Sequence, residues 1–198
     1  MSGVEPAGYG ITTRTALLGY CPNALENAAA HAIAMRVTSL SYMAGYGLCV
    51  AATTLVGQYL GAHNRAAARR SMVSCLVLVI GLMGSLGLGF FVGRYPLVLL
   101  FTHDETVIVL GVRVLFCVAL LQVFDGINLI AMGVLRGAGN TRWPMLVGLL
   151  LNWGIFVPSA ALAIFVWPGG IVAGWAAAVG TVVVLALMML LRVLRGAW

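Results

Sequence analysis

The sequence contains no lysine, and its charged residues are only eleven arginines and five acidic residues in a chain of 198. A soluble domain carries about 25% charged residues, far more than the 8% here, and so few charges would leave a water-exposed surface poorly solvated. Disorder is excluded too, because it requires low hydrophobicity and high charge, whereas 62% of these residues are hydrophobic. The lack of charge therefore indicates a membrane protein, whose natural unit is a span of roughly 20 residues.

Motifs of several functional classes are also missing. The four cysteines lie far apart and form neither a CxxC pair nor another metal-ligand spacing. The chain has no GxSxG elbow, no HExxH pair and no Walker loop. Its arginines lie between apolar runs, where a membrane protein keeps its topology charges, rather than on one basic face suited to nucleic acid. We therefore expect no enzyme activity, no cofactor, no structural metal and no nucleic-acid partner.

Long apolar runs are present instead, and none alternates in polarity as the strands of a membrane barrel do. One uncharged run, 143–191, would be about 74 Å long as a single helix. The hydrocarbon core of a bilayer is only about 30 Å thick, so this run must turn, and Pro168-Gly169-Gly170 is a turn sequence. The expected fold class is all-α, a polytopic membrane helix bundle. Its five transmembrane helices are expected at about residues 29–60, 71–93, 106–134, 143–166 and 171–191.

The arginines also predict an orientation. The connections 61–71 and 135–142 and the C-terminal tail hold seven of the eleven arginines, whereas the intervening connections hold Arg94 alone. Because basic connections stay in the cytoplasm, we expect a multi-pass protein of the inner (plasma) membrane with a cytoplasmic C-terminus. The polar N-terminal segment 1–27 would lie outside, yet it is no signal peptide. An odd number of spans with such a start indicates a missing earlier helix, so we expect the C-terminal piece of a larger protein.

Asp125 is the most informative polar residue in the spans. It lies 11 residues before Arg136, or about 16 Å along a helix, which places it near the bilayer midplane. An Asp at that depth costs about 2.5–3.5 kcal/mol, so it should face the bundle interior or a water-filled cavity, with Gln122 and Asn128 one turn away on either side. We interpret Asp125 as a carboxylate that binds H⁺ or Na⁺ and couples the ion to transport. The alternative is a protonated Asp hydrogen-bonded to a neighbouring helix.

Other residues are weaker candidates for a substrate cavity. Asn152 has about the same predicted depth as Asp125 on the next span, which favours a shared polar site at mid-depth. Trp153 is too deep for an interfacial aromatic belt and is expected to line the cavity with Gln122, Asn128 and Asn152. His31 is either a proton carrier beside the cavity, since His titrates near neutral pH, or a hydrogen-bonded interfacial residue. Pro158 is expected to kink the fourth span.

Four stretches of sequence carry a family resemblance. They are AAAHAIA at 28–34, AATTLVGQYLGA at 51–62, QVFDG at 122–126 and LRGAGNTRWP at 135–144. Together they resemble the C-terminal lobe of the MATE (multidrug and toxic compound extrusion) family, and the likeness covers nearly the whole chain.

The resemblance implies a fold and a function. Residues 28–198 would form a MATE-like C-terminal lobe whose five spans are the last five of twelve, and this lobe would need a second, N-terminal lobe. The activity implied is that of a secondary active antiporter that exports small cationic, amphipathic drug-like molecules as H⁺ or Na⁺ enters. In Na⁺-coupled members an Asp of this helix is a proposed cation ligand, and Asp125 matches it. The Tyr that some members place one turn earlier is Leu121 here.

Two other functions remain open. A related flippase or exporter of lipid-linked sugars would carry several cationic residues in its cavity to meet phosphate, and the spans here offer only Arg36 and Arg113. The other alternative is a non-transporting membrane subunit or an inert fragment, because five helices cannot form a two-lobe cavity alone. Such a subunit should tolerate Asp125→Asn, whereas an antiporter should not.

Overall fold

The computed structural model describes residues 24–165 and 170–196, and all secondary structure in these residues is helical. The elements are α2 (Ala24–Gly61), α3 (Arg65–Val92), α4 (Arg94–Leu99), α5 (Glu105–Gly137), α6 (Arg142–Leu151), the π-helix η1 (Asn152–Phe156), α7 (Val157–Phe165) and α8 (Gly170–Leu194). Five helices of the described part are long and apolar enough to cross a membrane, with α6, η1 and the start of α7 forming one of them. This confirms the predicted all-α class. The predicted turn at Pro168-Gly169 and most of the segment 1–27 lie outside the described residues.

Some helices begin at a different residue from the one that the apolar runs predicted, because a polar side chain caps the helix start. α3 begins at Arg65, before the expected start at residue 71, because the Asn64 side-chain oxygen accepts a hydrogen bond of 3.0 Å from the Ala67 N–H. A capped helix start satisfies otherwise unpaired backbone donors, and Arg is a good helix former. Asp104 caps α5 in the same way, through two N–H groups of its first turn. The arginines at the start of α3 are therefore helical.

The fourth span contains a wide turn rather than a continuous α-helix. In this turn the Val157 N–H donates a hydrogen bond to the Asn152 carbonyl oxygen, five residues earlier, instead of to the carbonyl four residues earlier. Pro158 follows immediately; proline has no N–H to donate and its ring collides with the carbonyl four residues before it, here that of Gly154. The expected irregularity at Pro158 therefore takes the form of a π-helical turn over Asn152–Phe156.

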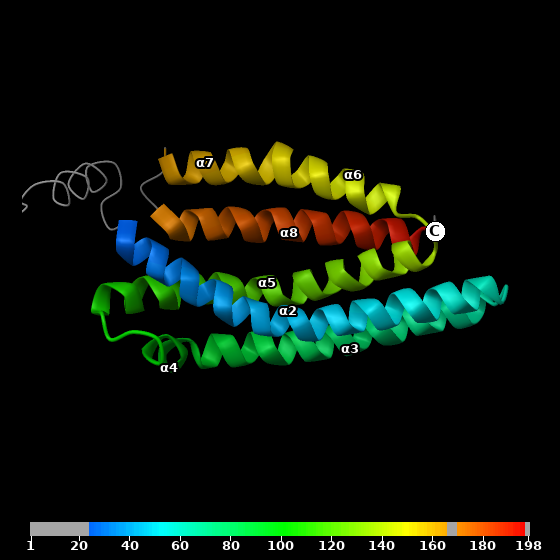
Figure 1. The fold of residues 1–198 in the computed structure, drawn as a ribbon, viewed down its shortest axis with the longest axis horizontal. Coiled ribbons are helices and arrows are strands. Elements are labelled where there is room, and N and C mark those ends of the chain that lie inside the picture. Colours follow the sequence, from blue (N-terminus) through cyan, green and yellow to red (C-terminus); the bar gives the residue numbers. More distant parts are fainter. Residues whose placement is uncertain (1–23, 166–169, 197–198) are drawn as a thin grey trace, which may run out of the picture.

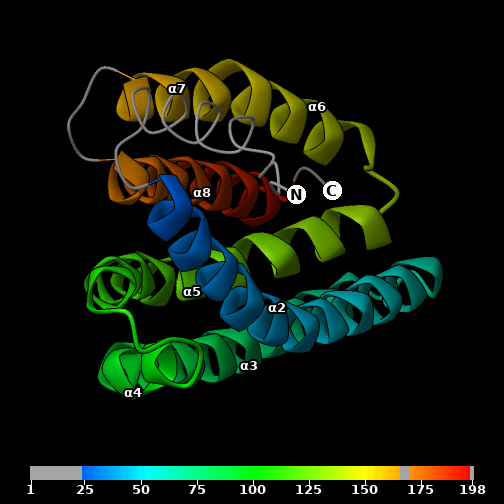
Figure 2. The same ribbon diagram turned by 60° about the vertical axis from the view of Figure 1, so that its left-hand side comes forward.

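α5 is the central helix of the bundle (Figure 1). Of its most apolar stretch, 56% is buried, against 28% or less for the other four spans. α2, α3 and α8 all pack directly on α5, while α7 packs on α8. Figure 2 shows α8 lying between α5 and the outer arm formed by α6 and α7. α2 approaches α8 only at its start and then diverges toward α3 (Figure 1).

Two apolar clusters join the helices, one toward each end of the bundle. The first joins α2, α3, α5, α6 and α8 and includes Val56, Met72, Leu135, Val147 and Met189. The second joins the start of α2 to α4, the first half of α5 and the start of α8, and includes Ile33, Val98, Val114, Leu115 and Trp175. Between the two clusters, the polar residues Ser41 and Gln122 are buried.

Candidate functional site

The candidate site is centred on the middle of α5. Gln122 and Asn128 are buried there, whereas Asp125 is partly exposed. Met132 and Arg136 follow Asp125 by 7 and 11 residues, which places all three on one face of the helix at about 100° per residue. Neither Met132 nor Arg136 is buried. Asp125 therefore belongs to a stripe of α5 that remains accessible while the flanking faces are packed.

Gln122 links α5 to α2. It has no exposed surface, and its side-chain Nε2 donates a hydrogen bond to Ser41 Oγ, which is itself 2% exposed. Ser41 Oγ in turn donates to the Thr38 carbonyl at 2.8 Å. Gly87 of α3 lies close on another side, since a Cβ built there would be 3.5 Å from Gln122 Cβ. Three helices thus enclose this side chain.

Two acceptor oxygens near Asp125 are buried without a partner. They are Gln122 Oε1 and Asn128 Oδ1, which lie one turn before and one turn after Asp125. A buried polar atom left unpaired normally costs about 1–3 kcal/mol, so such atoms indicate strain or an unseen ligand. Amide oxygens and carboxylates are ligand types that hard cations prefer, and Gln122 and Asn128 lie about 120° apart around α5, one on either side of Asp125.

Two tyrosines of α2, which the sequence analysis did not single out, extend the site. The rings of Tyr42 and Tyr46 stack with centroids 6.1 Å apart and planes inclined by 20°. They are 42% and 44% exposed, and Tyr42 is near enough to Asp125 to interact with it electrostatically. The two tyrosines are four residues apart, about one helical turn, and this spacing could have predicted from the sequence that their rings lie on the same face of α2. The result is an aromatic surface beside a carboxylate.

The structure does not bring the other expected residues to Asp125. Asn152 is exposed, and its amide donates to the Gly148 carbonyl of its own helix at 3.0 Å. Trp153 is 70% exposed. Both lie in η1, which packs against α8 rather than α5 (Figure 2). The expected polar site shared by Asp125 and Asn152 is therefore not formed. The two residues have about the same predicted depth, but α8 lies between α5 and η1.

His31 and Pro158 are also remote from Asp125. The His31 ring is exposed and lies 5.6 Å from the Trp175 ring of α8, near the starts of α2 and α8. Tyr42, which lies near Asp125, is 11 residues further along α2, or about 16 Å. Pro158 is exposed on the outer arm. A hollow of about 400 Å³ between α3 and α4, lined by residues such as Ser85 and Leu97, includes none of the expected site residues.

The described residues contain no cluster of three or more His, Cys, Asp or Glu side chains that could hold a metal ion. The cysteines Cys49, Cys75 and Cys117 are free and buried. Within the described part of the chain, the polar chemistry near the middle of the central span is thus one carboxylate with amides, hydroxyls and two phenol rings.

The family called MatE matches residues 13–162 of this sequence. The chain belongs to the MATE family. A probable multidrug resistance protein NorM from Thermotoga maritima is 30% identical over 173 residues, which are 87% of this chain and 37% of that protein. The NorM protein of Mesorhizobium japonicum is 33% identical over 175 residues, or 86% of this chain and 38% of that protein. The chain therefore spans less than two fifths of the length of these curated relatives.

Solved MATE structures share the fold. The eukaryotic MATE transporter AtDTX14 superimposes with a TM-score of 0.83 at 24% identity, over 92% of this chain and 41% of that one. An inward-facing multidrug resistance MATE transporter of the MOP superfamily superimposes with a TM-score of 0.72 at 16% identity, over 80% of this chain and 37% of that one. With five candidate spans and these relatives, the chain is a multi-pass membrane protein of a transporter family.

The Ser41–Gln122 bond gives a first testable prediction. Ser41→Ala removes the hydroxyl that accepts from the buried Gln122 amide, and we expect it to lower the free energy of unfolding by about 1–3 kcal/mol. Adding Gln122→Met to Ser41→Ala makes both partners apolar, which should recover most of the loss. Thermal unfolding in detergent, followed by helical circular dichroism, measures both changes.

The control is Ser39→Ala on the same helix, where the exposed hydroxyl bonds only to the Met35 carbonyl of its own turn. It should change stability by less than about 0.5 kcal/mol. Equal losses in Ser39→Ala and Ser41→Ala would show that a general effect of removing a serine hydroxyl from α2, and not the bond between α2 and α5, is being measured.

Proposed function

We propose that this chain is part of a secondary antiporter that exports cationic, drug-like compounds as H⁺ or Na⁺ enters, and that Asp125 binds the coupling ion. The observation that carries the proposal is the placement of Asp125: a partly exposed carboxylate near the middle of the central helix α5, flanked by the unpaired acceptors Gln122 Oε1 and Asn128 Oδ1. Intramembrane ionisable residues with this kind of access mark ion pathways. Multidrug resistance, in the names of the curated relatives, gives additional support.

Coupling requires that the ion and the substrate prefer different states of the transporter. A carboxylate on an accessible stripe of α5 can bind either a proton or Na⁺, and it attracts a cationic substrate only while it is charged and free. Binding of the coupling ion at Asp125 therefore weakens substrate binding on the same surface. This competition is the simplest way for the group to exchange one cation for another.

The stacked pair Tyr42 and Tyr46 supplies the substrate surface in this proposal. Phenol rings attract cations through their π faces by about 0.5–2 kcal/mol. Half-exposed rings near the middle of a span, beside Asp125, suit a flat organic cation that pairs its charge with the carboxylate. A lipid-linked sugar, whose phosphates carry negative charge, would be repelled by an ionised Asp125 on the same surface.

The proposed setting is the inner (plasma) membrane, with the C-terminus in the cytoplasm. The arginines at the start of α3 and at the ends of α5 and α8 support this orientation under the positive-inside rule. Because the chain spans less than two fifths of its relatives' length, we propose that transport also needs an N-terminal lobe.

The test is drug efflux by a chimera in which this chain replaces the matching 173 residues of the Thermotoga maritima relative. We expect energised cells that lack their own exporters to extrude ethidium when they carry the chimera. The double variant Tyr42→Leu/Tyr46→Leu should raise the KM for ethidium about 5- to 30-fold, as expected for the loss of one or two cation–π contacts. Its KM for a compact aliphatic ammonium should change less, because such a cation cannot stack.

The matched control is Tyr59→Leu, a half-exposed tyrosine near the other end of α2. It should leave both KM values close to those of the parent chimera. A parent chimera that reaches the membrane but exports no cation would refute the proposal, and equal KM changes in the two tyrosine variants would remove the substrate role of Tyr42 and Tyr46.

A further inference from the structure

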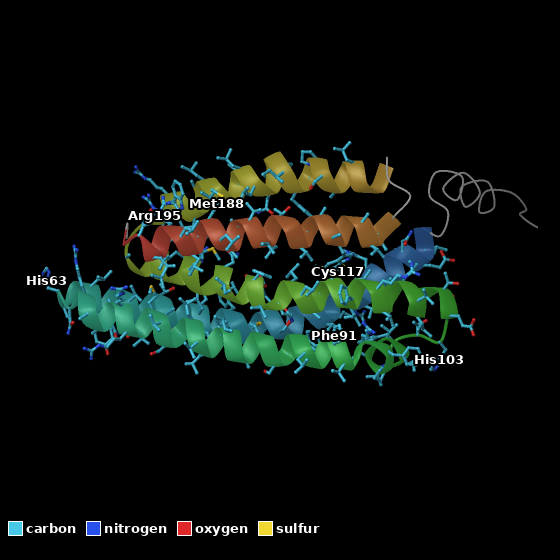
Figure 3. All side chains as sticks on the ribbon, turned by 180° about the vertical axis from the view of Figure 1, so that it is seen from behind. His63, Phe91, His103, Cys117, Met188 and Arg195 are labelled. Atoms are coloured by element: carbon cyan, nitrogen blue, oxygen red, sulfur yellow. The ribbon has the colours of Figure 1, made fainter. Side chains whose placement is uncertain are left out.

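One end of the bundle is rich in arginine. It contains the start of α3, the last turn of α5, the first residue of α6 and the end of α8, and these carry Arg65, Arg69, Arg70, Arg136, Arg142, Arg192 and Arg195. Figure 3 shows His63 and Arg195 at this end and His103 at the opposite one. Of the acidic residues in the described chain, Glu26, Asp104 and Glu105 lie at helix starts of the opposite end, and Asp125 lies inside α5. No carboxylate of the described residues is therefore available at the arginine-rich end.

Arg192 is held in a defined position at this end. Apolar packing of Leu135, Val147 and Val193 brings α5, α6 and α8 together there, with Trp143 against the same cluster. The guanidinium carbon of Arg192 lies over the Trp143 ring, 4.7 Å from its centroid. Stacking on an aromatic face fixes the plane of the guanidinium, so Arg192 differs from the freely exposed arginines around it.

One side-chain polar atom of each residue in this pair lacks a hydrogen-bond partner. Arg192 Nε and the Trp143 indole Nε1 are both buried and make no hydrogen bond. Burying part of a charged group without compensation is costly, and the other arginines at this end cannot compensate, because a guanidinium has no hydrogen-bond acceptor and carries the same charge. The arrangement is that of an incomplete anion site, because the positive charge is present and none of the described residues supplies a negative partner.

A phospholipid headgroup fits this site better than a free anion does. The planar fork of Arg binds phosphate oxygens in pairs, and basic pockets between helices at the cytoplasmic surface are suited to lipid phosphates. Leu191 and Leu194 are exposed on α8 beside Arg192, so an acyl chain has an apolar surface to follow. We infer that Arg192, stacked on Trp143, binds the phosphate of an anionic phospholipid, with Arg136 and Arg142 adding positive charge nearby.

The experiment measures lipid retention and stability of the purified chain, and it does not depend on transport. The chain is placed in phosphatidylcholine nanodiscs with or without phosphatidylglycerol. Native mass spectrometry counts retained lipids, and thermal unfolding reports stabilisation. We expect retained phosphatidylglycerol and a higher melting temperature, both reduced by salt because exposed charges are screened. Arg192→Gln should weaken retention about tenfold, the effect of losing a charge-assisted hydrogen bond to the lipid phosphate.

Arg65→Gln is the control, because it removes an equal charge from the same end without an aromatic partner. Arg65→Gln should keep most of the retained phosphatidylglycerol. Trp143→Phe keeps an aromatic ring under Arg192, so its retention of phosphatidylglycerol should be lower than that of the parent chain and higher than that of Arg192→Gln. Equal losses in Arg65→Gln and Arg192→Gln would overturn the inference in favour of diffuse surface charge. Equal stabilisation by inorganic phosphate in pure phosphatidylcholine would overturn it in favour of a soluble anion, and no effect of phosphatidylglycerol would overturn it outright.

Discussion

Asp125→Asn should abolish export by the chimera with the Thermotoga maritima relative, although the protein still reaches the membrane. Asn has nearly the same shape as Asp, so packing around α5 is preserved while the group loses its ability to ionise. An ion can shift a conformational equilibrium only by its differential affinity for the two states. Typical coupling energies correspond to about 5- to 150-fold, and we expect the initial efflux rate of ethidium to fall by about 100-fold, which is background in this assay.

The control for this loss is Asp104→Asn, at the N-cap of α5. There the Asp104 side chain accepts hydrogen bonds from the N–H groups of Thr106 and Val107, at 2.9 and 3.4 Å, and Asn caps a helix as well as Asp does. Efflux by Asp104→Asn should match the parent at equal membrane levels. Full efflux by Asp125→Asn would instead identify Asp125 as a protonated structural residue and would leave the coupling ion without its proposed site.

The sequence predicted which segments form the spans because partition into lipid depends on composition alone. Long apolar runs with few or no charges located five helices, and the observed spans contain them nearly in full over the described residues. The ends were less predictable, since they depend on local hydrogen bonds such as those of Asn64 and Asp104. The form of the break near Pro158 was also hidden, because a kink and a π-turn both relieve the same clash.

Lateral contacts between helices could not be read from the sequence. Counting residues from Arg136 and Arg142 gives the depth of Asp125 and Asn152, but it does not say which helix stands between them. Likewise the Ser41–Gln122 bond joins residues 81 positions apart, and no local pattern marks it. Only Asp125 with its neighbours Gln122 and Asn128 could be located as a group, because they share one helix.

Gly133→Ala should disrupt the contact between α2 and α5. A Cβ built on Gly133 would lie 2.6 Å from the Cys49 carbonyl oxygen, 3.1 Å from Cys49 Sγ and 3.2 Å from Thr53 Oγ1. The first of these atoms is backbone in the middle of a helix and cannot rotate away. Gly to Ala in a helix interior normally gains about 1 kcal/mol, whereas overpacking costs about 1–3 kcal/mol. Because both helices must separate to admit the methyl group, we expect an overpacking cost near the upper end of that range and a net loss of about 2 kcal/mol.

Gly81→Ala in α3 is the matched control, since nothing lies within 4 Å of the Cβ it would add. It should leave the melting temperature in detergent unchanged or raise it, while Gly133→Ala lowers it. A stable Gly133→Ala chain would mean that α2 and α5 do not approach as closely as described. The same substitution should also reduce efflux by the chimera at matched membrane levels. Moving α2 away from α5 would strain the Ser41–Gln122 hydrogen bond and increase the distance between Tyr42 and Asp125. The proposed substrate surface therefore depends on Gly133, although Gly133 itself contacts neither the ion nor the substrate in this proposal.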